Sequence, residues 1–288
     1  MNGWHVLAGV GVMAIWGINF PISKIGVAEF PPVFLIAMRF AIVAALLVPF
    51  LPRPRGSIRA LATLSVTIGT LHFGLMFTAL SLIEGSVAAI AVQTQVAFSA
   101  LLAALFFGDR LGWRRALGMA LAFGGVLLIA GDPRFVENPW PLLLVIGAAF
   151  AWAVGNIQIK RLGDVDFLVV NAWTTMFASP QLFAISLLLE DGQLDALGTA
   201  GWGGWGALAF QVCLASIVGY STWYALLKRY DVNQVVPLTL LVPVFGVISS
   251  VMALGEKLTP MMLAGGATTI VGVAIIIWRR PGVPRPVS

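Results

Sequence analysis

Charged residues are scarce in this 288-residue sequence, where Asp, Glu, Lys and Arg together make up only 10%. Soluble domains carry about 25% charged residues. Hydrophobic residues reach 59%, which is more than a water-soluble protein of this size can hide, because much of any folded surface faces its solvent. The composition therefore excludes an ordinary soluble globular domain and indicates that lipid surrounds most of the chain.

Cysteine is nearly absent and several catalytic motifs are missing. The single Cys213 excludes an internal disulfide and a cysteine-based metal cluster, and we interpret it as a small apolar helix residue. The sequence contains no G-x-x-x-x-G-K-[ST], H-E-x-x-H, C-x-x-C or G-x-S-x-G, the motifs of ATP motors and of common hydrolases. We therefore expect no enzyme, no cofactor and no bound metal, with an intramembrane enzyme as the weaker alternative.

Long apolar runs, in contrast, fill the chain. A helix needs about 17–25 apolar residues to cross a bilayer, and these runs are too uniformly apolar for the alternating strands of a barrel. The sequence thus predicts an all-α membrane protein with ten transmembrane helices. The predicted spans are 4–23, 32–51, 60–82, 86–107, 114–131, 139–159, 167–189, 204–227, 235–254 and 259–278.

Lys and Arg lie mostly on one side of these spans. With the N-terminus in the cytoplasm, the cytoplasmic loops and tail hold 13 of them and the outer loops hold only Lys24, Arg134 and Lys257, while Arg39 lies inside the second span. This bias follows the positive-inside rule and predicts that both termini face the cytoplasm. The basic residues form a fringe beside the membrane rather than a groove, so we expect no nucleic-acid partner.

Two distant parts of the sequence echo each other. AIWGINFPISK at 14–24 and FAWAVGNIQIK at 150–160 both place a Trp eight positions before a Lys, and FFGDRL at 106–111 matches ALGEKL at 253–258. Gly118 and Gly125 correspond to Gly265 and Gly272. We interpret the chain as two five-helix repeats, residues 1–131 and 132–288. Because five is odd, the second repeat enters the membrane from the opposite side, as in many secondary transporters.

The W-G-x-N-F-P stretch in the first span and the closing GDRL and GEKL motifs resemble the EamA-type drug/metabolite transporter superfamily over essentially the whole chain. GEKLT at 255–259 fits the closing pattern G-E-x-L-[ST], whereas GDRLG at 108–112 has Asp and Gly at two of its positions. Pro243 in the ninth span fits the superfamily, and the matching stretch of the fourth span, QTQVAF, lacks a proline.

This resemblance implies export of small organic solutes across the bacterial inner (plasma) membrane by alternating access. The expected substrates are amino acids and related metabolites, and a similarity to YddG-type exporters suggests aromatic ones. The alternatives are a multidrug or amphipathic-cation exporter and a channel-like facilitator. We expect the lipid bilayer and a small-molecule substrate as partners, and a monomer or weak homodimer.

Arg39 is the only fixed charge clearly inside a predicted span. It lies about eight residues from the outer end, or roughly 12 Å deep at 1.5 Å per residue. Its guanidinium fork suits a substrate carboxylate. The alternatives are a structural pairing with Glu84 or helix-end carbonyls, or snorkelling to the interface.

Other polar and aromatic side chains inside spans are candidates for the same site, because polar groups in lipid are costly. Gln93 and Gln95 are expected on different helix faces, so only one of them should line a given wall. Tyr220 and Tyr224 share a face that suits a flat substrate or a cation. Each candidate has a structural alternative in packing or interhelical bonding. The predicted substrate-binding set is Asn19, Arg39, His72, Gln93, Trp152, Asn156, Tyr220 and Tyr224.

Small residues and prolines are the expected mechanical elements. Gly147, Ala151 and Gly155 form a small-xxx-small seam for close helix packing. Prolines that interrupt spans free backbone carbonyls and are candidate hinges, namely Pro21, Pro180, Pro237 and Pro243. We expect the first, third, fourth, sixth, eighth and ninth spans to line a central cavity.

No Asp or Glu lies in the middle of a span. This favours facilitated movement or exchange over transport driven by an ion gradient, with His72 the only obvious proton carrier.

Overall fold

The ten predicted spans are present as helices in the computed structural model, which describes residues 1–54, 58–107, 112–163 and 165–277, without the side chains of 232 and 233. The described part of the chain contains no β-strand. In order, the spans are Gly3–Glu29 (α1), Pro32–Phe50 (α2 and η1), Ile58–Leu82 (α3, η2 and α4), Gly85–Phe107 (α5 and α6), Trp113–Ala130 (α7), Trp140–Leu162 (α9), Phe167–Leu189 (α10), Trp202–Arg229 (α12, η3 and α13), Val236–Leu254 (η4 and α15) and Pro260–Ile277 (α16).

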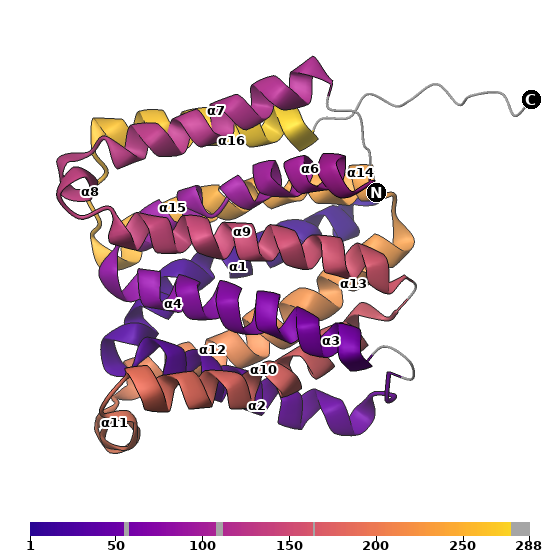
Figure 1. The fold of residues 1–288 in the computed structure, drawn as a ribbon, viewed down its shortest axis with the longest axis vertical. Helices are drawn as coiled ribbons and strands as arrows, with labels where there is room; N and C mark the ends of the chain where they lie inside the picture. Colours follow the sequence, from indigo (N-terminus) through magenta and orange to yellow (C-terminus); the bar gives the residue numbers. More distant parts are fainter. Residues whose placement is uncertain (55–57, 108–111, 164, 278–288) are drawn as a thin grey trace, which may run out of the picture.

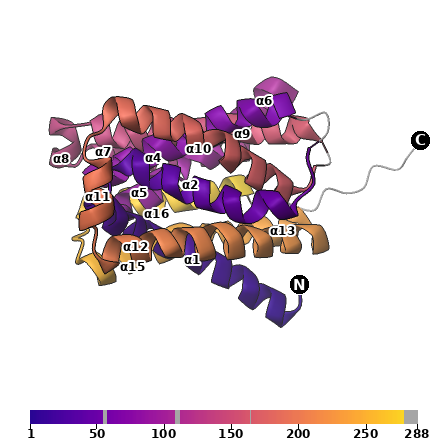
Figure 2. The ribbon, with the colours of Figure 1, turned by 90° about the horizontal axis from the view of Figure 1, so that it is seen from below.

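The spans lie side by side, and Figure 1 shows the N-terminus and the last turn of α16 at the same end of the bundle. We call this the terminal end. The short helices α8 (Pro133–Glu137) and α11 (Gln193–Thr199) lie at the opposite end, called here the α8–α11 end (Figures 1 and 2). The basic residues that the structure describes at the terminal end lie in a loop, for Arg53, or in the first or last turns of helices, for Arg59, Arg114, Arg115, Lys160, Arg161, Lys228 and Arg229. Arg55, Arg110, Arg279, Arg280 and Arg285 lie outside the described residues.

The first helix is longer than predicted, because it runs to Glu29 rather than residue 23. Pro21 lies inside α1 without ending it, since a proline removes one backbone donor but leaves the other helical bonds in place. Lys24 is therefore a helix residue and not an outer-loop residue as predicted. Its Nζ donates to the Leu80 carbonyl oxygen at 2.9 Å, which joins α1 to α4 (Phe73–Leu82) near the α8–α11 end.

The fifth and tenth spans pack through the glycines that the sequence pairs between the repeats. A Cβ on Gly118 would lie 2.7 Å from the Gly272 carbonyl oxygen, and one on Gly125 would collide with the Gly265 carbonyl oxygen. Gly118 of the first repeat therefore contacts the residue that corresponds to Gly125 in the second repeat, and Gly125 contacts the residue that corresponds to Gly118. This is the pattern of a self-complementary contact about a two-fold axis. Figure 1 shows α7 and α16 lying together along one edge of the bundle.

Two spans contain wide helical segments that the sequence did not predict. The segments η2 (Ser65–His72) and η3 (Gln211–Val218) are π-helices of eight residues each, and η3 follows η2 by 146 positions. Such segments are rare and frequently mark functional sites. Their matched positions in the third and eighth spans indicate that both repeats share the feature.

The fourth and ninth spans also change geometry at matched positions. The fourth is broken between α5 (Gly85–Ala91) and α6 (Thr94–Phe107), where Gln93 N–H donates to Ile90 O and Val96 N–H to Gln93 O, both at 3.0 Å. The ninth begins with the 3-10 helix η4 (Val236–Leu240) before α15 (Leu241–Leu254). The fourth span therefore bends without the proline that the superfamily pattern would place there. The GDRL motif at 108–111 lies outside the described residues.

Candidate functional site

A cavity of about 610 Å³ lies among the helices, and all eight predicted substrate-binding residues line it. Each of the six predicted lining spans contributes residues. The second and seventh spans contribute as well, through Arg39 on α2 and through Asn171, Thr174 and Thr175 on α10, and Ile277 adds the end of the tenth. The prediction left the second span out of the lining although it placed Arg39 in the binding set. On the seventh span, the small hydroxyl side chains of Thr174 and Thr175 give little sequence signal.

Arg39 is buried, with 3% of its surface exposed, near the middle of α2 (Pro32–Leu47). Its Nε donates to Ser216 Oγ on η3 at 3.0 Å, and its Cζ lies 5.4 Å from the centre of the Phe73 ring. The sequence alternative of a pairing with Glu84 is wrong, because the Glu84 carboxylate instead pairs with Arg134. Arg39 Nη1 is buried and makes no hydrogen bond to the described part of the chain.

His72 and Trp152 form one polar and aromatic corner of the cavity. His72 lies at the end of η2, its Nδ1 is 2.8 Å from the Ala148 carbonyl oxygen, and its ring centre is 4.7 Å from that of Trp152 on α9. Because a carbonyl can only accept, Nδ1 carries a proton in this contact. The histidine thus joins the third span to the sixth, which belong to different repeats.

Another part of the cavity wall is aromatic. Tyr220 and Tyr224 lie on α13 (Gly219–Arg229), with ring centres 5.9 Å apart and an interplanar angle of 16°. Tyr224 stacks in turn on Phe167 at 4.6 Å and 6°, while Trp16 packs against Tyr220 at 5.3 Å. The rings support one another and present a broad aromatic surface to the cavity.

The amide side chains lie where the helices are irregular. Gln93 and Gln95 both line the cavity, although the prediction placed them on different faces of one helix. The prediction assumed a regular α-helix, whereas the break between α5 and α6 turns the backbone there. Asn156 Nδ2 donates to Ser99 Oγ at 3.1 Å, and Asn19 Oδ1 is buried without a partner in the described structure.

Arg39 is the only charged residue on the cavity wall within the described chain, and no Asp or Glu lines it. A buried guanidinium without a counter-charge is unfavourable, because removal of a charge from water costs several kcal/mol unless a partner compensates it. Among the residues described, no three His, Cys, Asp or Glu side chains are grouped so that they could hold a metal ion.

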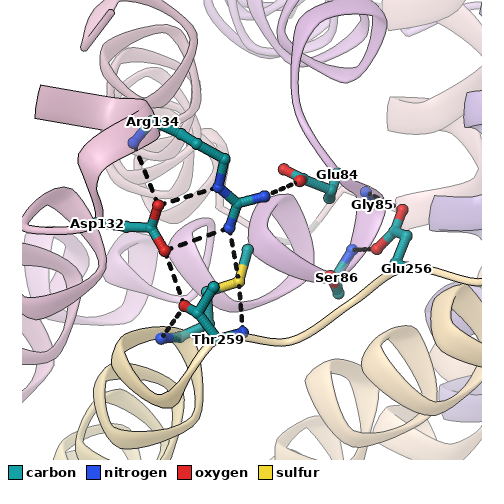
Figure 3. Close-up of polar contacts among 8 residues, drawn as sticks. Glu84, Gly85, Ser86, Asp132, Arg134, Glu256 and Thr259 are labelled. Carbon is teal, nitrogen blue, oxygen red and sulfur yellow. Dashed lines mark hydrogen bonds and ion pairs between the residues drawn. The ribbon is translucent and has the colours of Figure 1, made fainter. Parts of the chain in front are cut away.

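A polar cluster closes the structure at the α8–α11 end (Figure 3). Arg134 Nε donates to Asp132 Oδ1 at 2.9 Å and its Nη1 pairs with Glu84, while Thr259 Oγ1 donates to Asp132 Oδ2 at 2.8 Å. Glu256 accepts the backbone N–H groups of residues 85 and 86, at 2.7 and 3.0 Å, at the start of α5. We call Glu84, Asp132, Arg134, Glu256 and Thr259 the closing cluster.

The closing cluster explains why the GEKL motif contains a glycine followed by a glutamate. Gly255 has φ +66°, a left-handed conformation that suits glycine, and it ends α15 directly before Glu256. Glu256 then caps a helix of the first repeat from a loop of the second. The Arg134 guanidinium, with help from the Thr259 hydroxyl, lowers the pKa of Asp132 to about 2, so Asp132 is charged at neutral pH.

The cavity is closed on this side and extends toward the terminal end. Its lining residues nearest the α8–α11 end, Ser23 and Leu80, are 0% and 2% exposed. At the terminal end its wall includes half-buried residues from the last or first turns of their spans, such as Ile159, Phe167 and Ile277.

The predicted mechanical residues are placed as follows. Pro21 lies inside the continuous α1 and Pro180 inside the continuous α10, so the prediction that these two prolines interrupt their spans is wrong. Pro237 and Pro243 lie on either side of the junction between η4 and α15. The Gly147, Ala151 and Gly155 seam of α9 lies against the third span, where Cβ atoms added to its glycines would meet Leu75 and Ile68.

Comparison with known proteins identifies the family. The sequence profile of the EamA-like transporter family matches this chain twice, at residues 3–131 and 139–278. The chain belongs to the EamA-like transporter family. It is a multi-pass membrane transporter of small molecules and not an enzyme.

Relatives of this EamA-like transporter cover nearly its full length. A probable amino-acid metabolite efflux pump of Escherichia coli (strain K12) is 32% identical over 284 residues, which is 93% of this chain and 94% of that protein. A protein of the same description from Salmonella typhimurium (strain LT2) is 34% identical over 281 residues, with 93% and 92% covered. One solved crystal structure, at 19% identity, superposes with a TM-score of 0.63 over 96% of this chain and 98% of its own, and supports the fold alone.

Proposed function

We propose that this transporter exports amino acids, aromatic ones among them, by alternating access. The observation that carries the proposal is the single buried cation, Arg39, on a cavity wall that has no described carboxylate. A substrate carboxylate would supply the missing counter-charge, and an Arg fork binds a carboxylate through two parallel hydrogen bonds. The E. coli and Salmonella relatives, described as probable amino-acid metabolite efflux pumps, support the same substrate class.

The rest of the wall suits the remaining groups of an aromatic amino acid. The stacked Tyr220 and Tyr224 offer ring faces to an aromatic side chain, and such pairs contribute about 0.5–1.5 kcal/mol beyond buried area. An ammonium group is attracted by the same ring faces and by amide oxygens, of which Asn19 Oδ1 is unpartnered. We assign His72, Gln93, Trp152 and Asn156 to the same binding surface.

We propose that the protein lies in the bacterial inner membrane with both termini in the cytoplasm. The basic residues at the terminal end support this orientation through the positive-inside rule. In it, the closing cluster seals the outer side and the cavity extends toward the cytoplasm, which is the state that collects substrate for export. Two five-helix halves, 1–131 and 132–288, rock about Pro21, Pro237 and Pro243, and the cavity is framed within one chain, which supports a working monomer.

The alternative is an exporter of amphipathic cations. The aromatic wall favours it, because ring faces attract cations. Arg39 opposes it, because a cationic ligand would meet a like charge in a buried site, where repulsion is weakly screened. A channel-like facilitator is the third candidate, and kinetics separates it from a carrier.

Proteoliposomes that contain the purified protein test the proposal. We expect saturable counterflow of radiolabelled phenylalanine that excess tyrosine or tryptophan inhibits and that phenethylamine, which lacks the carboxylate, does not. Arg39→Ala should lower the rate at least tenfold, whereas Arg53→Ala, which removes an exposed cation at the terminal end, should leave it unchanged. Preferred transport of phenethylamine would favour the cation exporter, and a flux that never saturates would favour a channel.

A further inference from the structure

We propose that Ser216 is a positioning residue that holds the Arg39 guanidinium in the orientation that receives a carboxylate. The inference rests on the proposed function, because it concerns how the same site recognises its substrate. It is carried by the contacts of η3 with α2, which join the second repeat to the first.

The Ser216 hydroxyl lies between two partners whose roles are fixed. Its Oγ donates to the Gln211 carbonyl oxygen at 2.9 Å and accepts from Arg39 Nε at 3.0 Å. A hydroxyl has one proton to donate, and a guanidinium can only donate, so this is the sole arrangement that satisfies both bonds. Ser216 is 3% exposed, so competition from bulk water is weak.

The π-helical backbone makes this arrangement available. Gln211 and Ser216 are five residues apart, which is the spacing of hydrogen-bonded residues in a π-helix, and they lie within η3. In a regular α-helix a serine hydroxyl bonds the carbonyl three or four residues back. The wide segment thus turns the hydroxyl oxygen toward α2.

Two contacts restrict the Arg39 side chain. Ser216 Oγ accepts from Nε at 3.0 Å, and the Phe73 ring lies 5.4 Å from Cζ. Nη1 has no protein partner within the described structure. An arginine side chain held in this way loses less rotamer freedom when a carboxylate binds its fork.

The other repeat contains a neutral version of the same contact. Thr70, at the position of η2 that matches Ser216 at the 146-residue offset, donates to Gln181 Oε1 at 2.8 Å, and Gln181 Nε2 donates to Ser65 Oγ at 2.9 Å. Each π-helix therefore bonds the second span of the opposite repeat. Only the Ser216 contact holds a charged group, which is why we assign the positioning role to it.

The experiment compares Ser216→Ala with Ser179→Ala in phenylalanine counterflow. Ser179 is a matched control, because it is buried, donates to the Ala37 carbonyl oxygen of the same helix α2 at 3.2 Å and does not line the cavity. We expect Ser216→Ala to raise the half-saturation concentration about tenfold, in line with loss of a hydrogen bond to a charged group, with less than a twofold change in maximal rate. Ser216→Thr, which keeps the hydroxyl, should restore the wild-type value.

A second readout separates positioning from general damage. The effect of Ser216→Ala should appear in half-saturation and not in maximal rate, and the unfolding temperature of the variant in detergent should match that of Ser179→Ala. Should Ser216→Ala fail to fold, Ser216→Cys, which is nearly isosteric and a poor acceptor, provides the same test. A lower maximal rate with unchanged half-saturation, or no change in either, would overturn the positioning role. An inactive wild-type protein would instead overturn the proposed function on which it rests.

Discussion

Glu256→Gln should open the α8–α11 end of the cavity more often. The Glu256 carboxylate accepts two backbone N–H groups, at 2.7 and 3.0 Å, at the first turn of α5. Glutamine keeps one acceptor oxygen but removes the negative charge that complements the helix N-terminus. From the typical cost of weakening such a cap, we expect a loss of about 1–2 kcal/mol for the closed arrangement. A change of about 1.4 kcal/mol is tenfold in an equilibrium constant, so the open population should rise roughly tenfold.

Cysteine labelling from outside the cell measures this population. The exposed Cys213 is replaced by serine and Ser23, which is fully buried at the closed side of the cavity, by cysteine. A membrane-impermeant maleimide should then label the Glu256→Gln variant about ten times faster than its parent. Glu137→Gln is the control, because Glu137 is exposed on α8 at the same end and lies outside the closing cluster. Identical labelling rates in the parent and in Glu256→Gln would refute the closing role, provided that both proteins are equally abundant in the membrane.

Two further predictions concern stability. Gly125→Ala should lower the free energy of unfolding by about 1–3 kcal/mol, the usual cost of overpacking, because its Cβ would collide with the Gly265 carbonyl oxygen. In Gly124→Ala the new Cβ meets no atom within 4 Å, so this variant should be neutral or more stable by up to about 1 kcal/mol. Urea titration in detergent measures both free energies, and equal values would contradict the packing. The pKa of Asp132 is lowered to about 2, so its contribution to stability is complete above its unfolded pKa of about 3.9 and is lost as the pH falls toward 2. Thermal unfolding across this pH range should show this loss of stability in the wild-type protein and a smaller loss in Asp132→Asn. A loss of stability already at pH 5 to 6 would exclude Asp132 as its source.

Most of the architecture could be predicted from the sequence, because lipid imposes a simple rule on length and polarity. Ten apolar runs gave ten helices, with the largest error at the end of α1, where Pro21 did not stop the helix. The charge of Arg39 and the amides of Asn19 and Asn156 differed clearly from the apolar residues around them, and all three line the same cavity in the structure. Their roles in substrate binding stay predictions.

The features that the sequence did not predict depend on tertiary context. Nothing in SVTIGTLH or QVCLASIV distinguishes a π-helix from an α-helix, because both segments contain ordinary helix residues and no proline. Because the sequence does not reveal η3, Ser216 looks like any other small residue in an apolar span. Its hydrogen bond to Arg39 could therefore not be predicted. The joint placement of Gln93 and Gln95 was missed for the same reason, since a local break overrides helical periodicity.

The contact of α7 with α16 bears on how such a chain could have arisen. Gly118 meets Gly272 and Gly125 meets Gly265, so each helix uses the same surface to bind the other. A self-complementary surface needs no separate partner. A single ancestral polypeptide of half this length, inserted in both orientations, would already have had the interface that binds a second copy of itself. Fusion of two such genes would have required no new interface.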